Sequence, residues 1–181
     1  MLSRILCVCL SLSLFSVASS LSCRWMDHKF KEYSESCLDL LHVMGNNSTN
    51  STEDSEVQDA VAFPDDLYNQ ASQASAEGKL AFAVQVLDET AGLFEEDHSS
   101  ASWEENTADD FVNVVTQQAD ELRSCTGSHK RNKKLHMYFK RLSSLVKRMD
   151  HSADVWEVVR KQIKSHLMST DLLVSSLLPT N

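Results

Sequence analysis

Residues that break regular structure are scarce in this sequence, and that scarcity constrains the fold more than any other feature. The chain of 181 residues contains only four glycines and two prolines. A sandwich or barrel of short strands needs a turn, often with glycine or proline, about every 8–12 residues. The scarcity also excludes a glycine-rich loop that would hold a phosphate. The sequence therefore favours one compact, mostly helical domain.

Apolar residues recur at the spacing of a helix along five segments. In each segment they lie three or four positions apart, which places them on one face of a helix. Thr107 and Asp110 resemble a capping box, which predicts the start of one helix. Ser152 or Asp154 is predicted to cap the last helix. The pattern predicts an all-α bundle with five main helices, over residues 24–44, 80–94, 107–124, 135–149 and 155–178.

A long polar connection separates the first predicted helix from the second. Gly45 is predicted to end the first helix, and the connection extends to Gly78, with a short helix expected over residues 66–76. Its apolar and rigid point is Phe63 with Pro64, which we expect to be attached to the body of the domain. A connection of this length can cross the whole bundle, so the first two long helices need not be antiparallel neighbours.

The N-terminal segment has the pattern of a secretory signal. Arg4 precedes an apolar run that reaches Val17, and small residues follow before Cys23. The apolar core is too short to span a bilayer, which takes roughly 20 residues. We therefore expect residues 1–22 to be removed, leaving a single domain over residues 23–181 that is secreted and extracellular.

Secretion changes how the cysteines and asparagines are interpreted. The expected mature chain keeps three cysteines, which in an oxidising compartment means one disulfide and one remaining thiol. Cys37 lies on the apolar stripe of the first helix and is expected to be a core residue. Three acceptor sites for N-glycosylation begin at Asn46, Asn47 and Asn50, in the polar connection.

Charge is divided between the two halves of the chain. The formal net charge is −9, which argues against general affinity for nucleic acid. Residues 53–121 hold 18 acids and one base, whereas residues 122–181 hold 12 bases and four acids. Such a division steers charged partners, or the two surfaces only neutralise each other. The basic loop 129–134 could bind heparin-like polyanions or act as a nuclear signal. The basic amphipathic helix that follows could bind calmodulin or a membrane, but packing into the bundle is the simpler interpretation.

Patterns that would support catalysis or metal binding are missing from the sequence. The seven histidines are scattered, and the expected mature chain has no Cys-x-x-Cys pair. A nucleophile elbow is also absent. Acid clusters such as Glu95–Asp97 lack the hydrophobic surroundings that raise the pKa of a catalytic carboxyl. We expect no enzymatic activity, no cofactor and no metal.

Four segments, in order, resemble the type I interferons. The closest match is Val-Trp-Glu-Val-Val-Arg at the start of the last helix. Mammalian members usually have a cysteine where Asp154 stands, so the cysteine pattern is similar to that of the two-cysteine fish interferons. The four segments are Ala62–Asp66, Ser99–Glu105, Asp120–Cys125 and Val155–Arg160.

The resemblance implies a monomeric helical-bundle cytokine with up-up-down-down topology. It implies binding to two class II cytokine receptor chains, built from fibronectin-type modules, and activation of JAK–STAT signalling and antiviral genes. It also implies a Cys23–Cys125 bridge and no insertion into membranes.

One receptor chain is expected to contact the last helix and the first connection, and the second is expected to face the helices of residues 80–94, 107–124 and 134–149. The resemblance places the contacts of the first chain at Arg160, Lys161 and Lys164, with Phe63 in the connection. Helical spacing also puts the three basic residues off the core stripe, on an exposed side.

Two alternatives stay open at this point. One is another helical cytokine, such as a type III interferon or an interleukin-10 relative. The other is a secreted lipid carrier built from amphipathic helices, which would bind lipid micelles.

Overall fold

The computed structural model describes residues 23, 26, 29–45, 61–127 and 129–178. Within these ranges the regular structure is helical and contains no strand, which confirms the predicted all-α class. The expected signal segment 1–22 and the acceptor residues Asn46, Asn47 and Asn50 lie outside the described residues. The first helix covers residues 29–45. The later helices are α3 (Asp65–Ser72), α4 (Ala76–Phe94), α5 (Glu105–Ser124), α6 (Lys133–Arg148) and α7 (Ala153–Ser175).

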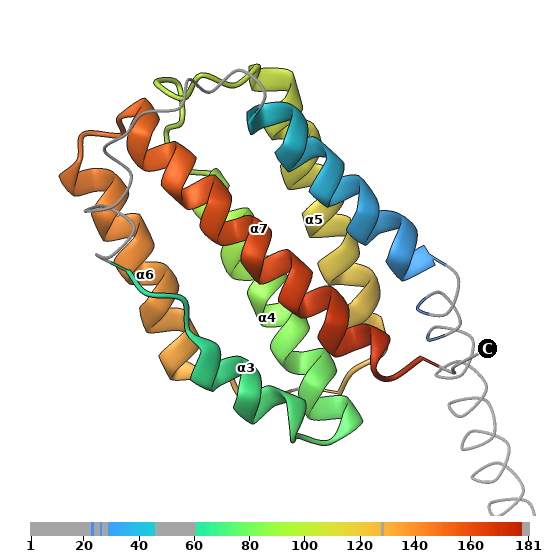
Figure 1. The fold of residues 1–181 in the computed structure, drawn as a ribbon. Coiled ribbons are helices and arrows are strands. Elements are labelled where there is room, and N and C mark those ends of the chain that lie inside the picture. The colour runs from blue at the N-terminus through green and yellow to red at the C-terminus, as the bar shows by residue number, and fades with distance from the viewer. Residues whose placement is uncertain (1–22, 24–25, 27–28, 46–60, 128, 179–181) are drawn as a thin grey trace, which may run out of the picture.

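The long helices form an up-up-down-down bundle with one further helix on its side. Figure 1 shows the first helix and α4 running in one direction, and α5 and α7 running in the other. The fifth long helix, α6, contacts α4 and α7. Short α3 contacts the same two helices at the end of the bundle where α4 begins (Figure 1). The expected parallel order of the first two long helices is therefore confirmed.

Helices α4 to α7 each begin two to four residues earlier than predicted from the sequence. Ser75 caps α4, because its Oγ accepts a 3.2 Å hydrogen bond from the Gly78 amide, so α4 begins four residues earlier than predicted. The prediction that Thr107 caps α5 is wrong, because α5 begins at Glu105 and Thr107 lies inside its first turn. The last helix is capped by Ser152, whose Oγ accepts from the Val155 amide at 3.4 Å.

The core lies between α7 and the helices around it. Trp156 on α7 is fully buried, with its ring 5.8 Å from that of Phe94 and 5.6 Å from that of Trp103. Cys37 is also fully buried, as predicted, and its Sγ lies 3.8 Å from Oε1 of Gln118 on α5. Burial raises the pKa of the Cys37 thiol to about 12, which keeps it protonated and unreactive.

The described part of the chain contains no helix that is both long and apolar enough to cross a membrane. Its histidines, cysteines and acids also form no group of three or more that would hold a metal ion.

Candidate functional site

The exposed side of α7 carries a continuous stripe of basic and apolar residues. Lys161, Lys164, Met168 and Leu172 follow one another at intervals of three or four positions, which places them on one face of the helix. Met168 is 50% exposed and Leu172 is 72% exposed, although both are large and apolar. An exposed apolar patch beside charged residues is typical of a protein-binding surface. We call these four residues the α7 face.

Arg160 does not belong to this exposed surface, and the prediction that it is exposed is wrong. Its side chain is buried, with a relative exposure of 9% for the residue. Nε and Nη2 donate to the two carboxylate oxygens of Glu157 at 2.7 and 2.6 Å. Nη1 donates to the Leu41 carbonyl in the first helix at 2.8 Å. Arg160 therefore ties α7 to the first helix.

Gly45 makes room for this guanidinium group. A Cβ atom at position 45 would lie 2.6 Å from Cζ of Arg160 and within 2.8 Å of both terminal nitrogens. The flat group therefore lies directly against the backbone at the end of the first helix. Because the long connection starts there, Arg160 fixes the point from which that connection leaves the bundle.

The far end of the connection is attached to α7 by a cluster of rings. Phe63 is half-buried, and its ring lies 5.2 Å from Tyr68 and 4.7 Å from His166. The Tyr68 hydroxyl and Nδ1 of His166 form a 2.7 Å hydrogen bond. Gln162 also donates to the Val61 carbonyl at 3.4 Å. The predicted attachment of Phe63 to the body of the domain is confirmed.

His166 is a fully buried histidine surrounded by rings from three parts of the chain. Besides Phe63 and Tyr68, the rings of Tyr138 and Phe139 on α6 each lie 5.0 Å from it. Burial lowers the pKa of His166 to about 3, so the ring is neutral near pH 7. Its Nε2 has no hydrogen-bond partner among the described residues.

Comparison with known proteins identifies the family. The profile of the interferon alpha/beta domain matches residues 26–177. The chain belongs to the interferon alpha/beta family. It is similar to interferon a3 of Oncorhynchus mykiss, with 33% identity over 86% of each chain, and to interferon alpha-1/2 of Canis lupus familiaris, with 28% identity over 62% of this chain and 64% of that one. Among solved structures it resembles zebrafish interferon 1, with a TM-score of 0.70 and 25% identity over 84% of this chain and 98% of that one.

The family membership agrees with the resemblance stated from sequence. Members of this family are cytokines that act by binding receptors, and they are not enzymes. The expected absence of catalysis is therefore confirmed by the family. The type I interferon fold also accounts for the long first connection, because parallel first and second long helices require it.

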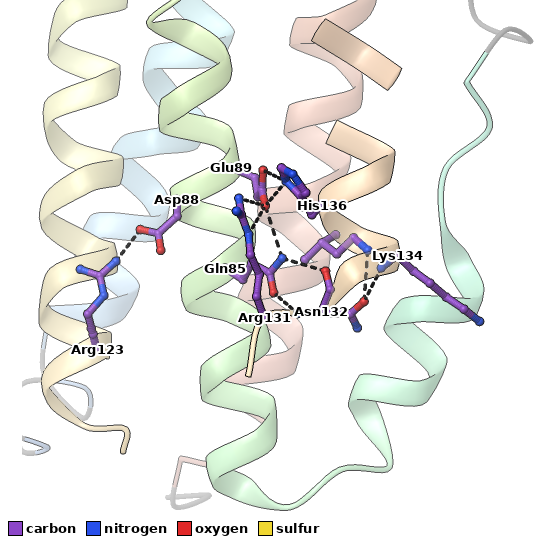
Figure 2. A network of polar contacts seen from close by, with 9 residues as sticks. Gln85, Asp88, Glu89, Arg123, Arg131, Asn132, Lys134 and His136 are labelled. Atoms are coloured by element: carbon purple, nitrogen blue, oxygen red, sulfur yellow. Dashed lines mark hydrogen bonds and ion pairs between the residues drawn. The ribbon is translucent and has the colours of Figure 1, made fainter. Parts of the chain in front are cut away.

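On the opposite side of this interferon, a polar network holds the α5–α6 connection against α4. Figure 2 shows it around Glu89, whose side chain is only 9% exposed. The Glu89 carboxylate accepts from Arg131 at 2.6 Å and lies 3.1 Å from Nδ1 of His136. Gln85 holds the backbone of Asn132 by two bonds, one to its carbonyl at 3.0 Å and one from its amide at 2.7 Å. We call these five residues the Glu89 network.

The sequence interpretation missed the residues that position the α7 face. Tyr68 and His166 carry no motif, and their contact becomes visible only when α3 is placed on α7. For Arg160 the sequence contains one indication of an ion pair, because Glu157 lies three positions before it in the same helix. That spacing does not show whether the pair is exposed or buried.

Proposed function

We propose that this interferon is a secreted antiviral cytokine that brings together two class II cytokine receptor chains and activates JAK–STAT signalling. One receptor chain contacts the α7 face together with the part of the first connection attached at Phe63. The observation that carries this proposal is the exposure of two large apolar side chains, Met168 and Leu172, one turn apart beside Lys164. The other exposed large apolar side chains of the described residues, Val43 and Met137, lie singly on two different helices. The lysines complement carboxylates on the receptor, and the apolar pair supplies the desolvated centre.

Within this proposal Arg160 and Phe63 position the receptor site. Arg160 holds the start of the first connection against α7, and Phe63 holds its end there. Of the three basic residues expected to contact the receptor, Lys161 and Lys164 keep that role in the proposal, and Arg160 does not. The side chain of Lys161 is 39% exposed, and its Nζ lies 3.9 Å from the Glu157 carboxylate.

The proposed mature form starts at Cys23, is monomeric and is joined by a Cys23–Cys125 bridge. Both cysteines are half-buried, and their sulfurs are not joined to each other in the structure. What supports the bridge is that the first helix starts at the same end of the bundle at which α5 ends (Figure 1). Glycans at Asn46, Asn47 and Asn50 would lie on the first connection.

Removal of the bridge gives a stability prediction. Cys23→Ser is expected to lower the free energy of unfolding by about 3–4 kcal/mol, because the bridge closes a loop of about 100 residues in the unfolded chain. Cys37→Ser is the matched control, and its effect should be much smaller, because Cys37 is a core residue that closes no loop in the unfolded chain. Urea titration of the secreted chain measures both. Peptide mapping that places Cys37 in the disulfide would contradict this assignment.

The signalling proposal is tested on teleost cells. Purified chain at nanomolar concentration is expected to cause STAT tyrosine phosphorylation followed by induction of antiviral genes. Deleting either of the two receptor chains separately should abolish the response, because one chain alone cannot assemble the signalling pair. A response that survives the deletion of each class II receptor chain in turn would contradict the proposal.

A further inference from the structure

The outer surface of α6 is strongly basic in a protein whose formal net charge is −9. The helix contains six lysines and arginines and no acid. All six are exposed, whereas the opposite side of α6 is buried against the bundle. The six residues, which we call the α6 cationic face, are Lys133, Lys134, Lys140, Arg141, Lys147 and Arg148.

The six cations form two parallel rows along the helix. Lys133, Lys140 and Lys147 are seven positions apart, and Lys134, Arg141 and Arg148 repeat that interval one residue later. An interval of seven residues is close to two turns, so each row stays on one side of the helix, with about 10.5 Å between successive members. Together the rows extend over about 22 Å. This arrangement is linear and regular rather than a compact cluster.

Most of these charges are not neutralised by the protein itself. Lys147 forms an ion pair with Glu96 at 3.1 Å. For the other five, no acid among the described residues lies within ion-pair distance. By contrast, the neighbouring Arg131 is neutralised by Glu89 within the Glu89 network. The α6 cationic face therefore presents at least five positive charges to solvent.

The placement of two cations works against helix stability. Lys133 and Lys134 occupy the first turn of α6, and that turn holds no acid. The N-terminal end of a helix carries partial positive charge, so cations there are unfavourable by a few tenths of a kcal/mol each. Figure 2 shows Lys134 extending away from the Glu89 network into solvent. Helix stability therefore does not account for the position of these two lysines.

We propose that the α6 cationic face binds a linear sulfated polysaccharide, the chemistry of glycosaminoglycans on cell surfaces. A linear polyanion can follow the helix axis and meet both rows, releasing its counterions as it does so. Nucleic acid fits less well, because the face has no exposed aromatic ring on which a base would stack. A membrane also fits less well, because Met137 is the only large apolar side chain among the rows.

Such binding would hold the interferon at the cell surface through contacts that do not include the α7 face. The buried side of α6 packs on α4 and α7, so the cationic face is directed away from the bundle. Met168 and Leu172 lie on the adjacent helix and are not part of the α6 cationic face. The polysaccharide and the receptor chain proposed at the α7 face therefore use different residues.

The test uses the purified chain, as cells produce it from the full sequence, on immobilised heparin. We expect retention at about 0.15 M salt and elution at higher salt than from a sulfopropyl exchanger of equal charge density. The variant with Lys140→Ser and Arg141→Ser removes the centre of both rows. Its affinity for a heparin oligosaccharide should fall about tenfold or more. The slope of log affinity against log salt should decrease by about 1.5.

A matched control separates this site from general attraction by charge. The variant with Lys29→Ser and Lys31→Ser removes the same charge from the exposed side of the first helix. It should elute at the salt concentration of the unmodified chain. Equal losses in the two variants, or passage of the unmodified chain through the column, would overturn the proposal. Tighter binding to phosphatidylserine vesicles or to DNA than to heparin would overturn it as well.

Discussion

Replacing Arg160 with alanine is expected to lower the free energy of unfolding by about 3 kcal/mol or more. The substitution leaves the Glu157 carboxylate, which is 13% exposed, without its bidentate partner. It also leaves the Leu41 carbonyl without the 2.8 Å bond from Nη1. Lys161, 3.9 Å from Glu157, offsets only part of this loss, because its contact is longer than the two hydrogen bonds from Arg160. Urea unfolding followed by circular dichroism at 222 nm measures the change.

Two further variants make the Arg160 result specific. Lys164→Ala, on the exposed side of the same helix, should change the free energy of unfolding by less than about 0.5 kcal/mol. Arg160→Lys keeps the charge but loses the two-pronged geometry, so it should retain only part of the stability. If Arg160→Ala unfolds at the same urea concentration as Lys164→Ala, the buried anchor between α7 and the first helix does not exist.

The second large effect is a loss of stability in mild acid caused by His166. Its pKa is about 3 in the folded protein, below the ordinary value of 6.5. The unfolded chain therefore takes up a proton before the folded protein does. The stability that the neutral ring contributes is fully present above pH 6.5 and is lost as the pH falls toward 3. Between pH 6.5 and 5.0 this single group should lower the free energy of unfolding by about 1.5 kcal/mol.

The pH slope distinguishes His166 from its neighbours. His166→Phe fills the ring cluster without a titrating group. The free energy of unfolding of this variant should therefore fall less steeply between pH 6.5 and 5.0, even if its value at pH 6.5 differs from that of the unmodified protein. His42→Gln removes an exposed histidine from the first helix and is the matched control for the slope. A slope in His166→Phe equal to that of the unmodified protein would show that protonation of this ring is not linked to unfolding.

The helical fold is predictable from sequence because the core repeats at the period of a helix. Apolar residues every three or four positions give α5 and α6 nearly in full, and the rarity of glycine and proline excludes most other folds. Helix starts were less predictable. Residues 76–79, which include Gly78, contribute almost no apolar signal, so the start of α4 depended on recognising Ser75 as its cap.

The geometry of the candidate site was predicted only in part, and the burial of Arg160 shows why. A single apolar stripe describes a helix that packs on one side, but α7 is covered by the first helix, α4 and α6 (Figure 1). Its buried arc is therefore wide enough to include Arg160, which lies outside the stripe formed by Val155, Val159 and Ile163. Sequence periodicity finds apolar burial, whereas the burial of paired or ring-enclosed polar groups depends on tertiary contacts.

The most direct test of the central proposal is the signalling potency of a folded α7-face variant. Lys164→Glu with Leu172→Glu reverses one charge and removes the most exposed apolar side chain of the α7 face. We expect an unchanged midpoint of thermal unfolding and a loss of potency in STAT phosphorylation of about 30-fold or more. Lys29→Glu, on the first helix, should retain full potency. Equal potency of the α7-face variant and the unmodified chain would contradict the proposal that this surface binds the receptor.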